Sequence, residues 1–137
     1  MHLPFASGTT TKQRRPLTVY KASAGSGKTF TLAVEYISLL VSDPENYRHI
    51  LAVTFTNKAT QEMKLRILSQ LYGIANSLPG SDTYMEKVME QTGLGAMAVR
   101  TNARQALSLL THHYNFFRVQ TIDAFFQGVL LNLAHKL

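Results

Sequence analysis

The feature that most constrains the fold of this 137-residue chain is a run of small residues, Ala22–Thr29, with the sequence ASAGSGKT. It follows a short apolar stretch, Leu17 to Tyr20, and it precedes a segment in which apolar residues recur at helical spacing. A glycine-containing turn that joins a strand to a helix and ends in Gly-Lys-Thr is typical of sites that surround phosphate groups. The run therefore predicts a strand, a phosphate-binding turn and a helix at the start of an α/β domain.

The residue types in this run suit the binding of a nucleoside triphosphate. Gly25 and Gly27 have no Cβ, so the backbone can bend towards the phosphates and its N–H groups can form an anion nest. The positive end of the following helix adds to the attraction. Lys28 is expected to reach the β- and γ-phosphates, and the Thr29 hydroxyl is expected to hold Mg²⁺. We therefore predict ATP and Mg as cofactors, with Lys28 and Thr29 as catalytic residues and Thr29 as the metal ligand.

The predicted nucleotide-binding residues are Ala22, Ser23, Ala24, Gly25, Ser26, Gly27, Lys28, Thr29 and Phe30. The strict motif has glycine in the place of Ala22. The alternative interpretation is a glycine-serine loop with a surface lysine. That alternative does not account for the strand pattern before the loop and the helix pattern after it.

The charge of the chain favours a polyanionic partner, because the net charge is +6 and the sequence pI is about 9.8. Residues 1–16 are polar and basic, and we interpret them as a flexible arm that is either solvated or in contact with phosphates. The chain has no cysteine, which excludes a disulfide framework and a thiolate metal site. With no apolar run of membrane-spanning length and no signal-peptide core at the start, a cytoplasmic protein is expected.

Strand and helix patterns alternate along the rest of the chain. Strands are predicted at 17–21, 50–55 and 118–122, and helices from about 28 to 42, from 57, at 82–92, at 96–114 and from 123 or 124 to the end. This order predicts an α/β fold with a parallel sheet and helices on both faces, in three layers. Three strands make an incomplete sheet, and an open apolar edge would favour self-association.

Three segments, 22–29, 53–63 and 119–126, together resemble the first motifs of the UvrD/RecB-like superfamily 1 DNA helicases. The second segment is similar to the family's TFTNKAAxEM box, with Thr60 where alanine is usual. The third is similar to its TIHSF box, with Asp123 where histidine is usual. The resemblance extends from Lys21 to Phe126, includes the RecB and AddA nuclease-helicases, and implies that residues 17–137 are the N-terminal part of a RecA-like P-loop NTPase domain.

The resemblance also implies contact with single-stranded DNA at the second and third boxes. The implied DNA-binding residues are Thr54, Phe55, Thr56, Asn57, Lys58 and Thr121. Chemistry agrees, because an aromatic side chain past a strand end can stack on a base and amides at a helix start can hold a phosphate. The alternative for Phe55 is a core position at the end of its strand. Asp123 has the wrong charge for a phosphate, so we interpret it as the N-cap of the last helix, and Asn57 as that of the second.

The function implied by the resemblance is that of an ATP-binding N-terminal fragment of an ATP-dependent DNA helicase or translocase in DNA repair or recombination, such as exodeoxyribonuclease V. Its partners would be single-stranded DNA, a second RecA-like domain, and a nuclease domain or partner subunit. Hydrolysis needs carboxylates that order Mg²⁺ and activate water. The chain lacks the family's DE box and second domain, so the fragment alone is expected to be an inactive ATP hydrolase.

Two other functions fit parts of the sequence. One is a non-catalytic module that binds single-stranded nucleic acid through Phe55 and basic residues. The other is a P-loop ATPase or kinase unrelated to DNA, which would leave the second and third boxes without a purpose. Lys64 and Arg66 are interpreted as a solvated helix face, and His112 and His113 as surface or packing residues.

Overall fold

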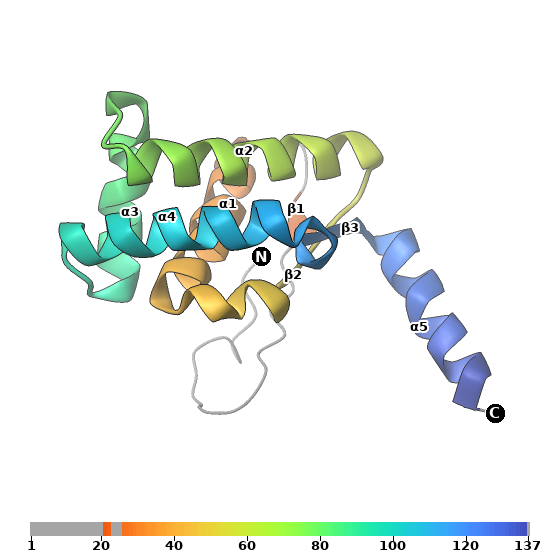
Figure 1. The fold of residues 1–137 in the computed structure, drawn as a ribbon. Helices are drawn as coiled ribbons and strands as arrows, with labels where there is room; N and C mark the ends of the chain where they lie inside the picture. The colour runs from red at the N-terminus through yellow and green to blue at the C-terminus, as the bar shows by residue number, and fades with distance from the viewer. Residues whose placement is uncertain (1–20, 23–25, 137) are drawn as a thin grey trace.

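The computed structural model describes residues 21–22 and 26–136 of the chain, in an order of strands and helices that begins with a strand (Figure 1). The strands are β1 (Lys21–Ala22), β2 (Leu51–Thr54) and β3 (Arg118–Thr121). The α-helices are α1 (Ser26–Ser42), α2 (Asn57–Ala75), α3 (Asp82–Thr92), α4 (Ala96–His112) and α5 (Ile122–Lys136). Short 3₁₀ helices are η2 (Pro44–Arg48), η3 (Pro79–Ser81) and η4 (Tyr114–Phe116). The predicted arm at 1–16, the first part of the predicted strand at 17–21, and Ser23, Ala24 and Gly25 lie outside the described residues.

The three strands form a parallel sheet in the order β1-β2-β3, which confirms the predicted parallel α/β arrangement. Each strand is joined to the next by helices, as parallel pairing requires. Every residue of β2 is buried. Ala52 belongs to the core that the helices share, whereas Leu51 and Val53 are buried outside that core, as the alternation of side chains along a strand predicts. The covering of both faces in three layers remains a prediction.

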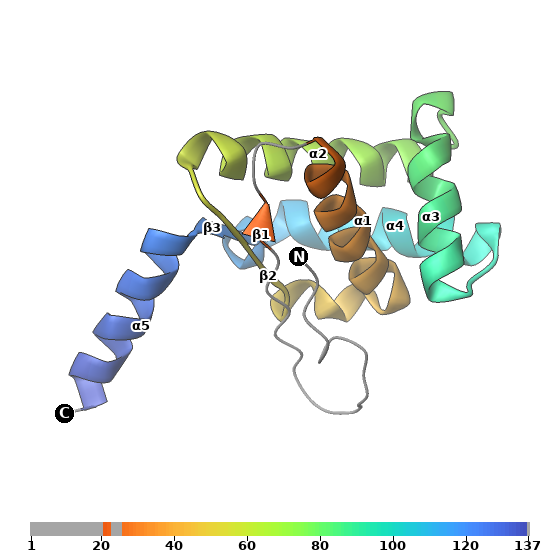
Figure 2. The ribbon, with the colours of Figure 1, turned by 180° about the vertical axis from the view of Figure 1, so that it is seen from behind.

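Helices α1, α2 and α4 pack against one another and form most of the core (Figures 1 and 2). The predicted apolar stripe of α2 is fully buried, and it consists of Met63, Ile67, Leu71 and Ile74. On α4, the buried positions include Val99, Ala103 and Leu110. Each large apolar side chain removed from water in this way stabilises the fold by about 1.5–3 kcal/mol.

Side chains of α4 also satisfy the last carbonyl groups of the two helices that it packs against. The Asn102 side-chain amide donates to the carbonyl oxygen of Val41 at 2.8 Å, near the end of α1. The Arg104 guanidinium donates to the carbonyl oxygen of Ala75 at 2.7 Å, at the end of α2. Helix ends leave such carbonyl groups without partners inside the helix. Helix α4 therefore contributes hydrogen bonds at the ends of α1 and α2, in addition to burying their apolar faces.

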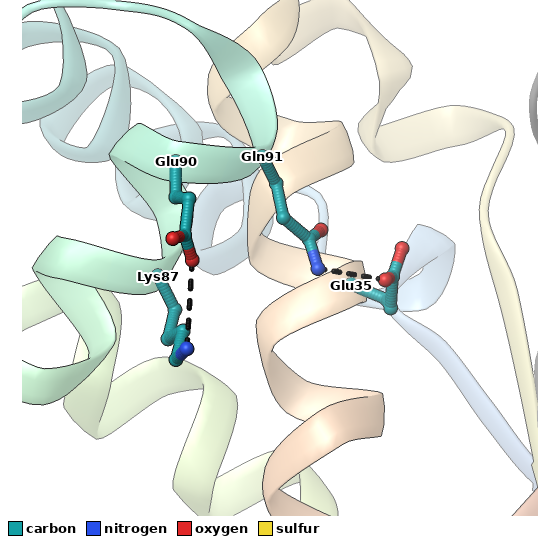
Figure 3. A network of polar contacts seen from close by, with 4 residues as sticks. All are labelled: Glu35, Lys87, Glu90 and Gln91. Atoms are coloured by element: carbon teal, nitrogen blue, oxygen red, sulfur yellow. Dashed lines mark hydrogen bonds and ion pairs between the residues drawn. The ribbon is translucent and has the colours of Figure 1, made fainter.

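Helix α3 is attached to α1 and α2 through its side chains. Figure 3 shows the Gln91 amide donating to the Glu35 carboxylate of α1 at 2.9 Å, next to an ion pair between Lys87 and Glu90 at 3.5 Å. The ion pair is exposed, and such pairs contribute little to stability. On α2, Arg66 donates to the Tyr84 hydroxyl at 2.9 Å. Arg66 is exposed, as the predicted solvated face requires, and its guanidinium also has a partner on α3.

Helix α5 differs from the other helices, because it projects away from them and buries none of its residues (Figures 1 and 2). Its exposed apolar side chains are Phe126, Val129, Leu130, Leu131 and Leu133. Among the described helices, none has the length and apolar character to cross a membrane. Self-association through the sheet edge remains a prediction, and α5 adds a second exposed apolar surface.

Candidate functional site

The three sequence motifs meet at one edge of the sheet, where the strands end. Parallel pairing aligns Ala22 of β1 with Thr54 of β2, and Thr54 with Thr121 of β3. A helix begins within a few residues of each of these positions. Binding sites of parallel sheets lie outside the carboxyl ends of the strands, so this edge is the candidate site. The register brings together segments that are far apart in the sequence.

The first junction joins β1 to α1 through Ser23–Gly25, which lie outside the described residues. Helix α1 begins at Ser26, slightly before the predicted start near Lys28. A Cβ added to Gly27 would meet open space, and Lys28 is exposed. The first turn of α1 carries no acidic residue, so the positive end of the helix dipole is not neutralised there. The described part of the predicted phosphate site is therefore accessible and electropositive.

Thr54 lies inside the protein rather than on the surface of the site. Its side chain is 1% exposed, and its hydroxyl lies 2.6 Å from the Thr60 hydroxyl. The carbonyl oxygens of Thr56 and Gln120, at 3.3 and 3.4 Å, are further acceptors within reach of its single proton. These contacts connect the end of β2 to α2 and β3. Thr54 thus positions the turn, which is a different role from the predicted direct contact with DNA.

Thr60 is a residue of this site that sequence reasoning did not assign. The related box has alanine there, and in this chain the Thr60 hydroxyl is buried against that of Thr54 and donates to the Thr56 carbonyl oxygen at 3.2 Å. A buried hydroxyl requires hydrogen-bond partners. The departure at position 60 and the buried Thr54 therefore belong to one hydrogen-bonded unit. The sequence signal for this pair was the presence of threonine at both position 54 and position 60.

The turn between β2 and α2 presents Phe55, Thr56, Asn57 and Lys58 to solvent. The alternative of a core position for Phe55 is wrong, because half of this side chain (50%) is exposed. The Thr56 hydroxyl accepts a hydrogen bond from the Ala59 N–H at 3.0 Å, so Thr56 is the N-cap of α2. The predicted cap at Asn57 is therefore wrong. Because Asn57 is the first residue of the helix, its side chain does not serve as the N-cap.

The junction between β3 and α5 repeats this arrangement. The Thr121 hydroxyl accepts a hydrogen bond from the Ala124 N–H at 3.1 Å. The predicted N-cap at Asp123 is therefore wrong, because α5 begins at Ile122 and Asp123 lies in its first turn. There its carboxylate is favoured by the positive end of the helix dipole. Two neighbouring strands thus end in the same way, with a threonine hydroxyl that orients the first turn of the next helix.

The described residues contain no group of three His, Asp or Glu side chains that could hold a metal ion by themselves. The metal prediction therefore depends on Thr29, which is partly exposed in the first turn of α1. A single hydroxyl is a suitable ligand for Mg²⁺ when the phosphates of a nucleotide supply further oxygens. The geometry of this edge is compatible with a nucleotide site next to a surface that carries an aromatic side chain.

Comparison with known proteins gives a match to one domain family and to several bacterial proteins of one kind. The profile of the UvrD/REP helicase N-terminal domain matches residues 6–135. The RecBCD enzyme subunit RecB of Haemophilus influenzae is 30% identical over 130 residues, which are 86% of this chain and 11% of that protein. RecB of Escherichia coli K12 is 31% identical over 121 residues, 80% of this chain and 10% of that protein.

Over a shorter stretch, RecB of Chlamydia trachomatis is 56% identical over 52 residues, which are 37% of this chain and 5% of that protein. The chain therefore spans about a tenth or less of the length of these relatives. A search of solved structures found no match.

Proposed function

Because the chain belongs to the UvrD/REP helicase N-terminal domain family, we propose that it is the ATP-binding N-terminal part of an ATP-dependent DNA helicase or translocase that acts on single-stranded DNA. The observation that carries this proposal is the register of the sheet, which aligns Ala22, Thr54 and Thr121 at one edge. A motor of this kind needs its nucleotide and its DNA to affect the same structural elements. The shared edge supplies such a connection.

The nucleotide would bind at the first junction. Lys28 would contact the β- and γ-phosphates and Thr29 would hold Mg²⁺, which neutralises charge on the phosphates when bound. The support comes from the exposed Lys28 and from the first turn of α1, which carries no carboxylate. Negative phosphates are favoured at such a helix start. Ser23, Ala24 and Gly25 complete the proposed cradle from the sequence motif.

Single-stranded DNA would bind at the second and third junctions. The half-exposed ring of Phe55 is available to stack on a base, which contributes about 1–3 kcal/mol per base in single-strand-binding proteins. Exposed Asn57 and Lys58 lie next to it and can hold phosphate oxygens. Thr54 and Thr60 would hold this turn in place from below. Movement at the nucleotide would then reach the DNA through the edge of the sheet, along which all three junctions lie.

Hydrolysis requires more than the residues at this edge. Asp123 is the acidic residue at the end of β3, whereas Asp43 and Glu45 precede β2 at the opposite edge. No adjacent Asp-Glu pair occurs in the sequence. We therefore expect the fragment to bind Mg-nucleotide weakly and not to turn it over. In a longer protein, a second RecA-like domain would supply the missing groups, and a nuclease domain or partner subunit would complete the enzyme.

The proposal is tested by two binding titrations on the purified chain, one with Mg-ADP and one with a fluorescent oligo-dT. Lys28→Ala should remove nucleotide binding, and Phe55→Ala should weaken DNA binding by about five-fold or more. Lys87→Gln is the control, because it removes one positive charge from a lysine whose ion-pair partner, Glu90, is on the same helix, α3. Steady ATP hydrolysis that Lys28→Ala abolishes would contradict the proposed inactivity of the fragment. DNA binding that Phe55→Ala leaves unchanged would contradict the proposed DNA surface.

A further inference from the structure

A cluster of aromatic and basic side chains lies at the opposite edge of the sheet, where β2 and β3 begin. Helix η2 leads into β2 and helix η4 leads into β3, and the parallel strands place both at the same edge. We name this group the η4 cluster, and its members are Tyr47, Arg48, Lys64, His113, Tyr114, Phe116 and Phe117. It includes neither the phosphate-binding motif nor the exposed turn after β2.

Rings hold the cluster together. Tyr47 packs edge-on against Phe116 with ring centroids 5.9 Å apart, and it also lies 5.7 Å from the His113 ring. Tyr114 packs edge-on against Phe117 at 5.7 Å. Tyr47 and Phe117 are buried, whereas 48% of Tyr114 is exposed. The cluster thus has a fixed base in the core and an aromatic side chain at the surface.

Two cations lie over these rings. The Arg48 guanidinium is 5.6 Å from the centre of the Tyr47 ring and 5.2 Å from that of Phe116. The Lys64 ammonium is 5.0 Å from the centre of the Tyr114 ring and 5.9 Å from that of Phe117. These distances are within the range of cation–π attraction. Lys64 is partly exposed on its predicted solvated face, and the contact of its ammonium group with two aromatic rings was not predicted.

Neither cation is neutralised by a carboxylate, since neither Arg48 nor Lys64 forms an ion pair with a described residue. A cation over a ring keeps N–H groups that can donate to an anion. The rings restrict both side chains, so less conformational entropy is lost when a ligand binds. A single strand of nucleic acid binds through contacts to its phosphates and through stacking of its bases. The two cations without a carboxylate partner can supply the phosphate contacts, and the exposed tyrosine can supply the stacking surface.

We propose that the η4 cluster is a second contact for single-stranded nucleic acid, in which Arg48 and Lys64 hold phosphates and Tyr114 stacks on a base. This inference rests on the proposed function for its ligand and extends it to the opposite edge. Strand β2 separates the two edges by only about 10 Å, because its four residues span three steps of about 3.3 Å each. One strand of nucleic acid can therefore contact both edges. The net charge of +6 supports the same ligand.

The inference is tested by fluorescence anisotropy with an oligo-dT of about 16 nucleotides, the upper site size of small single-strand-binding folds. Arg48→Gln should lower the slope of log affinity against log salt by about 0.7, which corresponds to one lost phosphate contact. Tyr114→Leu should reduce the affinity about five-fold or more. Lys87→Gln, whose lysine is paired with Glu90, should change neither quantity.

A second measurement needs no substitution in the cluster. Mass spectrometry after brief acetylation of the wild-type chain should show that oligo-dT protects Lys64 more than Lys87. Poly-glutamate of equal charge should not protect it. Equal reactivity of Lys64 with and without oligo-dT, or equal protection by poly-glutamate, would overturn the inference.

The two proposals fail in different ways. If Phe55→Ala weakens binding while Arg48→Gln and Tyr114→Leu do not, the proposed function stands and the second contact is wrong. If only the variants of the η4 cluster weaken binding, the cluster binds nucleic acid and the DNA surface proposed at Phe55 is wrong.

Discussion

Helices α4 and α5 are similar in length and both are rich in apolar residues, yet their environments are opposite. Helix α4 buries Val99, Ala103, Ala106 and Leu110 between α1 and α2. Helix α5 buries none of its residues, although it carries two phenylalanines and several leucines. The difference shows that apolar content alone does not make a helix part of the core. A substitution in the packed helices should therefore cost much more than the matching substitution in α5. Three comparisons test this, and a fourth compares a buried and an exposed tyrosine within the packed helices.

The largest contrast is expected for leucine truncation. Leu71→Ala removes a fully buried side chain of α2 and should lower the free energy of unfolding by about 2–5 kcal/mol, because a cavity remains in the core. Leu133→Ala makes the same change at a side chain of α5 that is 56% exposed and should change it by less than about 0.5 kcal/mol. Urea denaturation followed by circular dichroism measures both. Equal losses would mean that α5 is packed in solution.

Replacement of two helical glycines by alanine should have opposite effects, one destabilising the fold and the other favouring its helix. A Cβ on Gly73 of α2 would collide with the side chain of Ser81, so Gly73→Ala should destabilise the fold by about 1–3 kcal/mol. A Cβ on Gly128 of α5 would meet nothing within 4 Å, so Gly128→Ala should raise the helix content by removing a glycine penalty of about 1 kcal/mol. Thermal melts and far-ultraviolet dichroism of both variants give the signs. A stable Gly73→Ala variant would contradict the close approach of α2 and η3.

The two threonine caps provide the next comparison. Thr56→Ala removes the cap of α2, which packs in the core, and should destabilise the whole fold by about 1 kcal/mol. Thr121→Ala removes the equivalent bond at α5 and should fray that helix with little effect on the cooperative transition. Hydrogen exchange of individual amides separates global from local opening. If Thr121→Ala alone destabilised the whole fold, the assignment of α2 to the core and of α5 to the surface would be wrong.

The smallest effect at neutral pH is expected for Tyr36 of α1. Burial raises the pKa of its phenol well above the ordinary value of 10.0. The folded protein therefore binds this proton more tightly than the unfolded chain, and the resulting stability is present below pH 10 and is lost as the pH rises further. The exposed Tyr72 of α2 provides the control position. The free energy of unfolding, measured between pH 8 and 11, should depend less on pH in Tyr36→Phe than in the wild type, with Tyr72→Phe as the control variant.

Much of the fold could be predicted from the sequence, because local periodicity decides which residues face a core. The stripe from Met63 to Ile74 is buried as its spacing indicates, and the apolar run that became β2 is buried along its whole length. The order of strands and helices also predicted a parallel sheet, and parallel pairing is what brings the three motifs to one edge. These are properties of short segments and of parallel topology, so they do not depend on distant contacts.

The errors concern choices between neighbouring polar residues and contacts between distant segments. Asn57 and Asp123 are good N-cap residues by type, but Thr56 and Thr121 are the last residues before the helices turn and their hydroxyls reach the N–H groups. Lys64 and Arg66 lie on the predicted solvated face, but their contacts with η4 and α3 were not predicted, because no local pattern reveals them. Burial of Thr54 follows from the pairing of its hydroxyl with Thr60, a contact between two elements.

The central claim is that nucleotide and single-stranded DNA bind along one edge of the sheet, at the starts of α1, α2 and α5. Amide chemical-shift mapping by NMR tests it most directly, with Mg-ADP added first and oligo-dT second. The account predicts that Mg-ADP perturbs the amides around Lys28, and that oligo-dT perturbs those from Phe55 to Lys58 and around Thr121. Perturbations by both ligands that avoid these amides and gather instead at the turn between α3 and α4 would contradict it.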